Sequence, residues 1–120
     1  MSHVVQIQTQ VRDPAAIGCA CQRLQLPAPV EGEFQLYTTR ESGLGIQLRG
    51  WRYPVVCKPK TGEIKYDNFG GHWGAQEELE RFLQAYSVEK AAIEARRRGH
   101  SVVEQPLSDG SIKLTITIGA

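Results

Sequence analysis

The stretch AQEELERFLQAYSVEKAAIEARRR, residues 75–98, decides how the rest of this chain must fold. Its apolar residues recur every three or four positions, which predicts one amphipathic helix with a single apolar stripe. Acidic residues lie near its start and three arginines at its end, as the helix dipole favours, and Gly99 follows them. Such a stripe needs a sheet to cover it. Its members are Leu79, Phe82, Leu83, Tyr86 and Ile93.

Two elements are predicted before the central region. Residues 5–11 alternate apolar residues or threonine with glutamine, as in a strand with one wet face, and a sheet of such strands is usually antiparallel. Asp13-Pro14 then has the composition of a helix start, and the apolar spacing over residues 17–24 predicts a short helix that ends before Pro27.

The region between the two helices predicts a meander of four short strands. Each has a β-rich composition and is separated from the next by turn residues. The glycine-rich residues 68–74 are too flexible in composition to continue a strand, so they form a connection into the long helix. The strands span residues 34–38, 45–49, 53–58 and 63–67, with turns across Glu41-Ser42-Gly43 and around Thr61-Gly62.

A hairpin is predicted after the long helix. Asp109-Gly110 separates residues 101–105 from a cleanly alternating run, residues 112–118, whose apolar set should lie on a covered face. No repeat or linker divides the chain. The whole chain, residues 1–120, is therefore expected to form one α+β domain: a mainly antiparallel sheet, one long amphipathic helix, one short helix and a C-terminal β-hairpin.

Composition excludes several classes of protein. With 120 residues and 41% hydrophobic side chains, the chain can bury a core without disulfides, and its three cysteines are expected to be free thiols. No apolar run is long enough for a membrane span and no signal peptide is visible, so we expect a cytoplasmic protein with no membrane partner. The net charge of +1 favours no class of ligand.

Several segments together resemble a small conserved hypothetical family of cyanobacterial and plastid genomes, a domain of unknown function that also occurs in other bacteria. Matching segments occur from the start of the chain to its end and are densest in the last third. Residues 49–73 depart from the family pattern. It implies no known activity, and it implies an AAA-class ATPase as a candidate partner. The matching segments are Met1-Ser2-His3, Arg12-Asp13, Arg81-Phe82-Leu83, Tyr86, Glu94-Ala95, residues 99–105 and residues 109–114.

Sites for metals, cofactors and catalysis find little support. Cys19 and Cys21 would point about 200° apart on a helix and could not share a zinc ion. No phosphate-binding, dinucleotide-binding or metalloprotease motif occurs, so no cofactor is expected. His72-Trp73 could present a base or a ligand-binding ring with Asp67 close in sequence, but packing of Trp73 under the first helical turn explains the same residues better. The sequence therefore favours a protein that is not an enzyme.

Basic and aromatic residues alternate in the central strands. Cations that hold phosphate and rings that stack on bases could bind single-stranded nucleic acid, whereas the alternative is an ordinary solvent-exposed face with lysines guarding an edge. The candidate binding residues are Arg49, Trp51, Arg52 and Tyr53, beside Tyr37, Arg40, Lys58, Lys60, Lys65 and Tyr66.

Lys90 and Arg97 fall within the apolar stripe of the long helix. Their stems could cover the stripe while their charges reach water. If that end of the helix is instead incompletely covered, it becomes a docking surface. The leading hypothesis is therefore a non-enzymatic adaptor or assembly module that binds another protein or itself; nucleic-acid binding, and ligand binding or catalysis at His72 and Trp73, are the alternatives.

Overall fold

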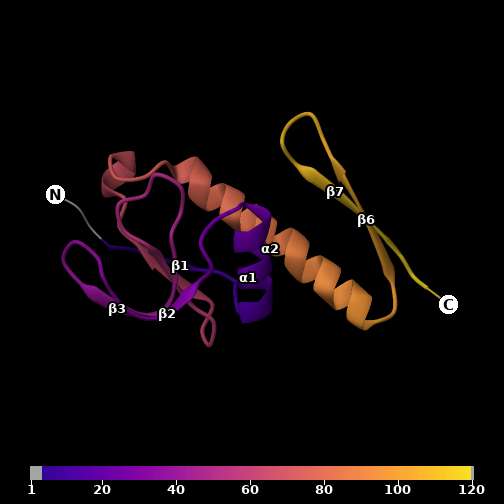
Figure 1. Cartoon of the computed structure of the whole chain (residues 1–120), viewed down its shortest axis with the longest axis horizontal. Helices are drawn as coiled ribbons and strands as arrows, with labels where there is room; N and C mark the ends of the chain where they lie inside the picture. The colour runs from indigo at the N-terminus through magenta and orange to yellow at the C-terminus, as the bar shows by residue number, and fades with distance from the viewer. Residues whose placement is uncertain (1–3, 120) are drawn as a thin grey trace.

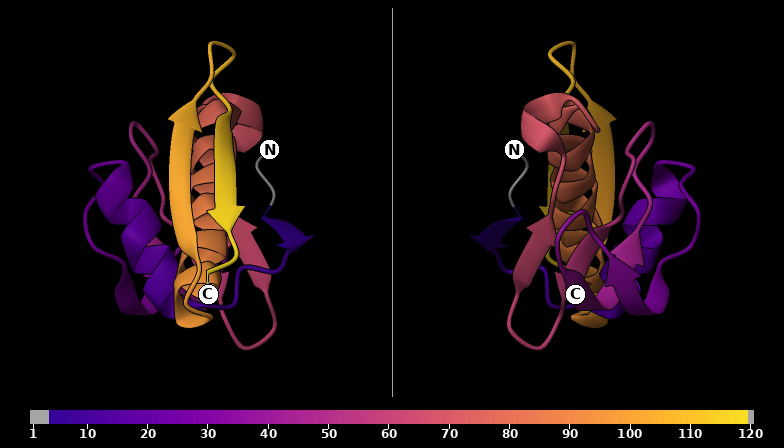
Figure 2. Two further views of the ribbon diagram at one scale, coloured as in Figure 1. Left: turned by 90° about the vertical axis from the view of Figure 1, so that its right-hand side faces the viewer. Right: turned by 90° about the vertical axis from the view of Figure 1, so that its left-hand side faces the viewer.

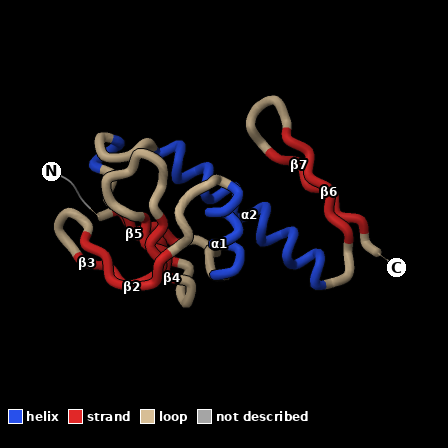
Figure 3. The backbone as a smooth tube through the Cα atoms, viewed as in Figure 1, coloured by secondary structure: helices blue, strands red, loops and turns tan. Residues whose placement is uncertain are grey.

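The computed structural model describes residues 4–119, which form two antiparallel sheets, two α-helices and one short 3-10 turn (Figures 1 and 3). The molecule is elongated, 54 × 32 × 23 Å, because the C-terminal hairpin stands apart from the main sheet. The predicted α+β class is confirmed. Met1-Ser2-His3, part of the resemblance described above, lies outside the described residues.

The main sheet has five antiparallel strands in the order β1-β5-β4-β3-β2. Strands β2 to β5 form the predicted meander, and the N-terminal strand pairs with the last of them, placing Ile7 opposite Ile64. The turn predicted around Thr61-Gly62 is confirmed. The strands are β1 (Val5–Gln8), β2 (Val30–Gln35), β3 (Arg40–Ile46), β4 (Val55–Lys58) and β5 (Glu63–Tyr66).

The turn between β2 and β3 comes earlier in the chain than the sequence predicts. Residues 36–39 make the turn, with the Leu36 N–H donating to the Thr39 carbonyl over 2.8 Å, and Glu41-Ser42-Gly43 belongs to β3. Glycine in this strand serves close packing instead of a turn. A Cβ at Gly45 would lie 2.5 Å from the Phe34 ring, so the absence of a side chain lets that ring lie directly on β3.

Both helices pack on one face of the sheet. Asp13 caps α1 (Pro14–Arg23) as predicted, accepting hydrogen bonds from the N–H groups of Ala15 and Ala16. The long helix α2 (Gln76–Arg97) agrees closely with residues 75–98, and Gly99 follows it with φ 78°. Most of the predicted stripe is in the core, which joins α1 and α2 to β3, β4 and β5 through Ile17, Ile46, Val55, Ile64, Leu79 and Phe82.

The glycine-rich connection before α2 contains a short 3-10 turn, η1 (Phe69–Gly71). Asn68 organises it: its buried side chain donates to the Gly74 carbonyl, and its own carbonyl accepts from the N–H of Trp73. The backbone of this connection is bonded to the segment before β4, because the Arg52 N–H donates to the Trp73 carbonyl over 2.8 Å. The loop is therefore fixed on both sides.

The C-terminal hairpin, β6 (Ser101–Pro106) and β7 (Ile112–Thr117), is confirmed as predicted but forms a sheet of its own. It packs on α2 on the opposite side from the main sheet (Figure 1). In the left view of Figure 2 its strands lie in front of α2, with β6 on the side of α1 and β7 on the other. Two strands alone cannot cover the helix fully.

Candidate functional site

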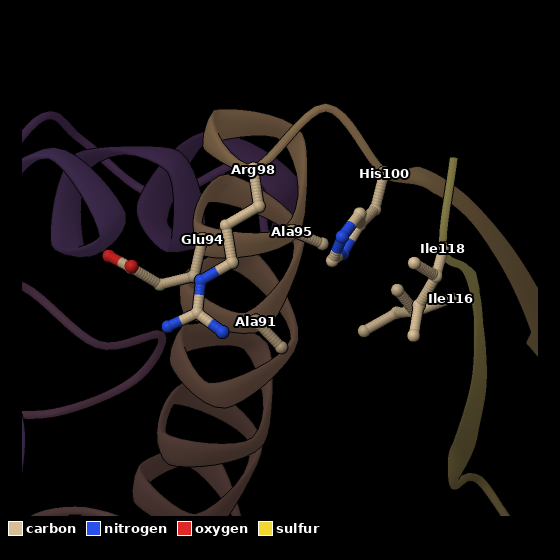
Figure 4. A pocket seen from close by; sticks show the side chains of 7 residues that line it. All are labelled: Ala91, Glu94, Ala95, Arg98, His100, Ile116 and Ile118. Atoms are coloured by element: carbon tan, nitrogen blue, oxygen red, sulfur yellow. The ribbon is translucent and has the colours of Figure 1, made fainter. Parts of the chain in front are cut away.

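A groove runs between the C-terminal half of α2 and strand β7, and we call it the α2–β7 groove (Figure 4). Its volume is about 440 Å³. Two alanines of α2 form its floor, two isoleucines of the β7 segment form its wall, and polar residues stand at its rim. The lining residues are Ala91, Glu94, Ala95, Arg98, His100, Ile116 and Ile118.

The apolar wall of the α2–β7 groove is only partly covered. Ile112 and Leu114 are half-buried against the helix, but Ile116 is 43% exposed and Ile118 is 78% exposed. All four belong to the alternating set whose face the sequence predicts to be covered. In Figure 4 the two isoleucines point toward α2 across the open groove. Coverage therefore ends midway along β7.

The other strand of the hairpin, β6, is held to the helices by ion pairs. Arg23 of α1 lies 2.9 Å from Glu89 of α2 and 2.8 Å from Glu104 of β6. The hydrogen bond from Arg23 lowers the pKa of Glu104, and the hydrogen bonds to Glu104 and Glu89 raise the pKa of Arg23 despite its partial burial. These half-buried pairs hold β6 in place and leave the β7 side of the hairpin open.

Lys90 and Arg97 lie near this groove but are engaged within the chain. The Lys90 Nζ is 2.9 Å from Glu94 and 3.1 Å from Asp13, and hydrogen bonds to both carboxylates raise its pKa. Arg97 is 3.2 Å from Glu94. The pKa of Glu94 is lowered, first by the hydrogen bond from Lys90. Lys90 thus ties the start of α1 to α2, and of the two predicted binding residues only Arg97 is largely exposed.

A second group of predicted residues gathers around Trp73, which is half-buried. The Arg52 guanidinium lies 4.9 Å from the Trp73 ring and 5.6 Å from that of Tyr53. Tyr37, which is 53% exposed, is 5.1 Å from Trp73 between ring centroids, and Phe69 is 4.8 Å away. The structure therefore brings Arg52, Tyr53 and Trp73 together with Tyr37, which the sequence predicts beside the candidate residues, and with the Phe69 ring, which it does not.

Trp51 and Arg49 lie apart from that cluster. Trp51 is buried, stacks edge-on with Tyr66 and donates its indole N–H to the Ala75 carbonyl over 3.0 Å, so it fastens the start of α2. Gly74 makes this possible, because a Cβ there would lie 2.4 Å from the indole ring. Arg49 is exposed and donates to the Leu24 carbonyl at the end of α1.

The basic residues of the central strands are mostly paired with carboxylates. Lys58 and Lys65 lie 3.5 and 3.2 Å from Glu41 on the face of the sheet away from the helices. Arg40 pairs with Glu33 at 2.6 Å. Buried Trp51 and Tyr66 cannot stack on a base. Apart from Tyr37, Arg52 and Tyr53, which meet at Trp73, the cations and rings that the sequence places in one region thus do not share one face.

His72 is exposed beside the Phe69 ring, with centroids 5.0 Å apart. Asp67, its neighbour in sequence, is 1% exposed and accepts a hydrogen bond from the Phe69 N–H, so it shapes the turn. Among residues 4–119, no group of three His, Cys, Asp or Glu side chains could hold a metal ion. Within that same range, neither helix is long and apolar enough to cross a membrane.

Comparison of the chain with models of known protein families, with curated proteins and with solved structures gave no significant match.

Proposed function

We propose that this protein is a non-enzymatic assembly module that docks a protein surface in the α2–β7 groove. The observation that carries the proposal is the exposure of Ile116 and Ile118 on the same strand face whose earlier residues are covered by α2. A partner chain laid in the groove would continue that coverage. An AAA-class ATPase as that partner, membership of the cyanobacterial and plastid family, and a cytoplasmic location stay predictions.

Small side chains and a charged rim support a protein as the occupant. Ala91 and Ala95 allow close approach of a backbone or helix to α2, and Glu94 and Arg98 offer charges of both signs at the rim. An apolar centre with a polar edge is the usual anatomy of a protein interface. A phosphate-bearing ligand would meet only mixed charge here.

Nucleic-acid binding is the weaker alternative. It needs several free cations beside exposed rings, and Lys58, Lys65 and Arg40 have carboxylate partners. The residues that could still contact a nucleic acid are Arg52 and the exposed rings around Trp73. Catalysis at His72 is weaker still, because Asp67 is bonded to the turn backbone and His72 lies against the Phe69 ring.

The experiment is size-exclusion chromatography with light scattering, with the absorbance ratio at 260 and 280 nm recorded on the same peak. We expect a mass above the 13.3 kDa of one chain with a normal ratio. Ile118→Asp should abolish the complex without loss of stability, because the replaced side chain is 78% exposed. Thr117→Asp adds the same charge next to it on the other strand face, and it should leave the complex intact.

Two outcomes would overturn the proposal. One is a 13.3 kDa monomer that carries excess absorbance at 260 nm, which would favour nucleic-acid binding through Arg52 and the rings around it. The other is a complex that tolerates Ile118→Asp as well as Thr117→Asp, since its contact would then lie outside the groove.

A further inference from the structure

We infer that the partner docked at the groove is a second copy of this chain, whose β7 pairs edge to edge with β7 of the first. The inference rests on the assembly function proposed above and adds the identity of the partner and the atoms that join it. Three independent features of the hairpin support it: the direction of its backbone groups, the difference between its two edges, and the pattern of its side chains.

The backbone groups of β7 that point away from β6 can be assigned from the ladder. The Leu107 N–H donates to the Ser111 carbonyl over 2.9 Å, which makes these two a hydrogen-bonded pair. Bonded and non-bonded pairs alternate along an antiparallel ladder. In the observed register, Ile112, Leu114 and Ile116 fall at non-bonded positions, so their N–H and C=O groups face the open edge.

The two edges of the hairpin differ in how well they are protected. On β6 the outward positions include Pro106, which has no N–H, and Glu104, which the Arg23 guanidinium holds. On β7 the outward row has no proline, and the strand's single charge is Lys113. Natural edge strands are normally protected by proline, charge or covering elements. The edge of β7 is therefore the one suited to pairing.

The side chains of β7 are complementary to themselves. When two copies are related by a two-fold axis through Leu114, Ile112 of one lies opposite Ile116 of the other, and all outward backbone groups of these residues find partners. Lys113 lies opposite Thr115, so no like charges meet. Apolar cross-strand pairs of this kind stabilise antiparallel sheets.

The helices behind the strands fit the same arrangement. Because α2 lies behind the hairpin (Figure 2), the two-fold axis places the two α2 helices on the same face of the four-stranded sheet that the two hairpins would form. The axis also makes the helices antiparallel, so the acidic start of each (Glu77, Glu78, Glu80) lies toward the basic end of the other (Arg96, Arg97, Arg98). The charges at the two ends are complementary in a dimer.

The first test needs no substitution. Amide hydrogen exchange of the wild-type protein, resolved by residue with NMR, is compared at high and low protein concentration. The N–H groups of Ile112, Leu114 and Ile116 should exchange at least roughly tenfold more slowly at high concentration, whereas those of Val102 and Glu104, which face the β6 edge, should not change. Equal exchange of the β7 amides at both concentrations, while the mass stays that of a monomer, overturns the inference.

Matched variants test the edge itself by light scattering. Ile116→Pro removes an outward N–H of β7, Ile116→Ala removes most of the same side chain but keeps the N–H, and Val102→Pro removes the N–H at the paired position on β6. We expect Ile116→Pro to raise the dimer dissociation constant about a hundredfold, a factor of ten for each of the two copies. Ile116→Ala should have a smaller effect and Val102→Pro none. Circular dichroism checks that each variant keeps its hairpin.

The outcomes separate this inference from the function on which it rests. A dimer that dissociates with Val102→Pro but tolerates Ile116→Pro overturns pairing through β7. A complex that dissociates with Ile118→Asp yet tolerates Ile116→Pro also overturns the pairing, but it leaves the assembly function standing. A chain that is monomeric at every concentration and carries no partner overturns both.

Discussion

The Nζ of Lys90 lies 3.1 Å from the Oδ2 of Asp13, whose Oδ1 caps α1. One carboxylate therefore both caps the short helix and joins it to the long one. We expect Asp13→Ala to lower the free energy of unfolding by about 0.5–2 kcal/mol, the usual cost of a lost N-cap. Asp13→Asn keeps a capping oxygen and loses the charge, so it should cost less. Urea denaturation measures both, and equal losses would mean that the cap contributes little.

The Asp13 carboxylate also makes the free energy of unfolding depend on pH. Burial of Asp13 by itself raises its pKa, but hydrogen bonds from Lys90 and from the N–H groups of Ala16 and Ala15 outweigh burial and lower the pKa below 3.8. An unfolded chain then takes up this proton first, so the stabilisation is complete above pH 3.8 and is lost as the pH falls through the lower folded value. Asp13→Asn should therefore lose stability less steeply below that pH. This prediction would be contradicted if the urea midpoints of the wild type and of Asp13→Asn fell equally as the pH is lowered.

The buried hydroxyl of Tyr86 holds the segment that leads into α1. It accepts hydrogen bonds from the N–H groups of Arg12 and Asp13, over 3.1 and 3.0 Å, and donates one to the Gln10 carbonyl over 3.3 Å. Tyr86→Phe leaves those donors without a partner, and we expect a loss of about 1–3 kcal/mol in the free energy of unfolding. Tyr53→Phe is the control, because its ring lies at the half-exposed Trp73 cluster. A change below about 0.5 kcal/mol at Tyr86 would mean that water replaces the hydroxyl.

The stacking of Arg52 on Trp73 should be measurable as stability. Exposed cation–π contacts contribute about 0.5–1 kcal/mol, so we expect Arg52→Ala to lower the free energy of unfolding by that amount. Arg52→Lys should recover part of it, since an ammonium also binds a ring face but without stacking. Near-ultraviolet circular dichroism should report a changed environment of Trp73. An unchanged spectrum would show that the guanidinium does not rest on the ring in solution.

The three cysteines should differ sharply in reactivity. Burial raises the pKa of Cys21 to about 11 and that of Cys57 to about 12, while Cys19 is half-exposed on α1. At pH 8 we expect an aromatic disulfide reagent to modify Cys19 alone in the folded protein, and all three thiols in denaturant. Cys19→Ser should abolish the reaction under native conditions. Fast modification of Cys57 without denaturant would mean that the core opens readily.

The elements with strong local signals could be predicted from the sequence. Asp13-Pro14, the stripe of α2 and Asp109-Gly110 each depend on contacts within a few residues, and each is where the sequence predicts it. The β2–β3 turn is different. Gly43 looks like a turn residue, yet it lies within β3, where Gly45 makes room for the Phe34 ring of the neighbouring strand. No local pattern distinguishes a glycine that bends the chain from one that admits a ring.

The candidate sites were harder to predict because they depend on register. Lys58 and Lys65 are seven residues apart, and only the pairing of β4 with β5 shows that both reach Glu41. The alternating isoleucines of β7 predicted a covered face. The sequence could not show that the hairpin pairs with no third strand of the described chain, which is why Ile116 and Ile118 lie in an open groove.

The separation of the hairpin from the main sheet also orders events during synthesis. Every strand of the five-stranded sheet is complete by Tyr66, and both helices that cover it are complete by Arg97. The residues of the sheet and of both helices therefore leave the ribosome before residues 101–117. Among residues 4–119 the strands of the hairpin pair only with each other, and hairpins form within about 1–10 μs. If β7 pairs with a second copy as inferred above, a nascent chain presents that pairing edge only after the sheet and both helices have been synthesised.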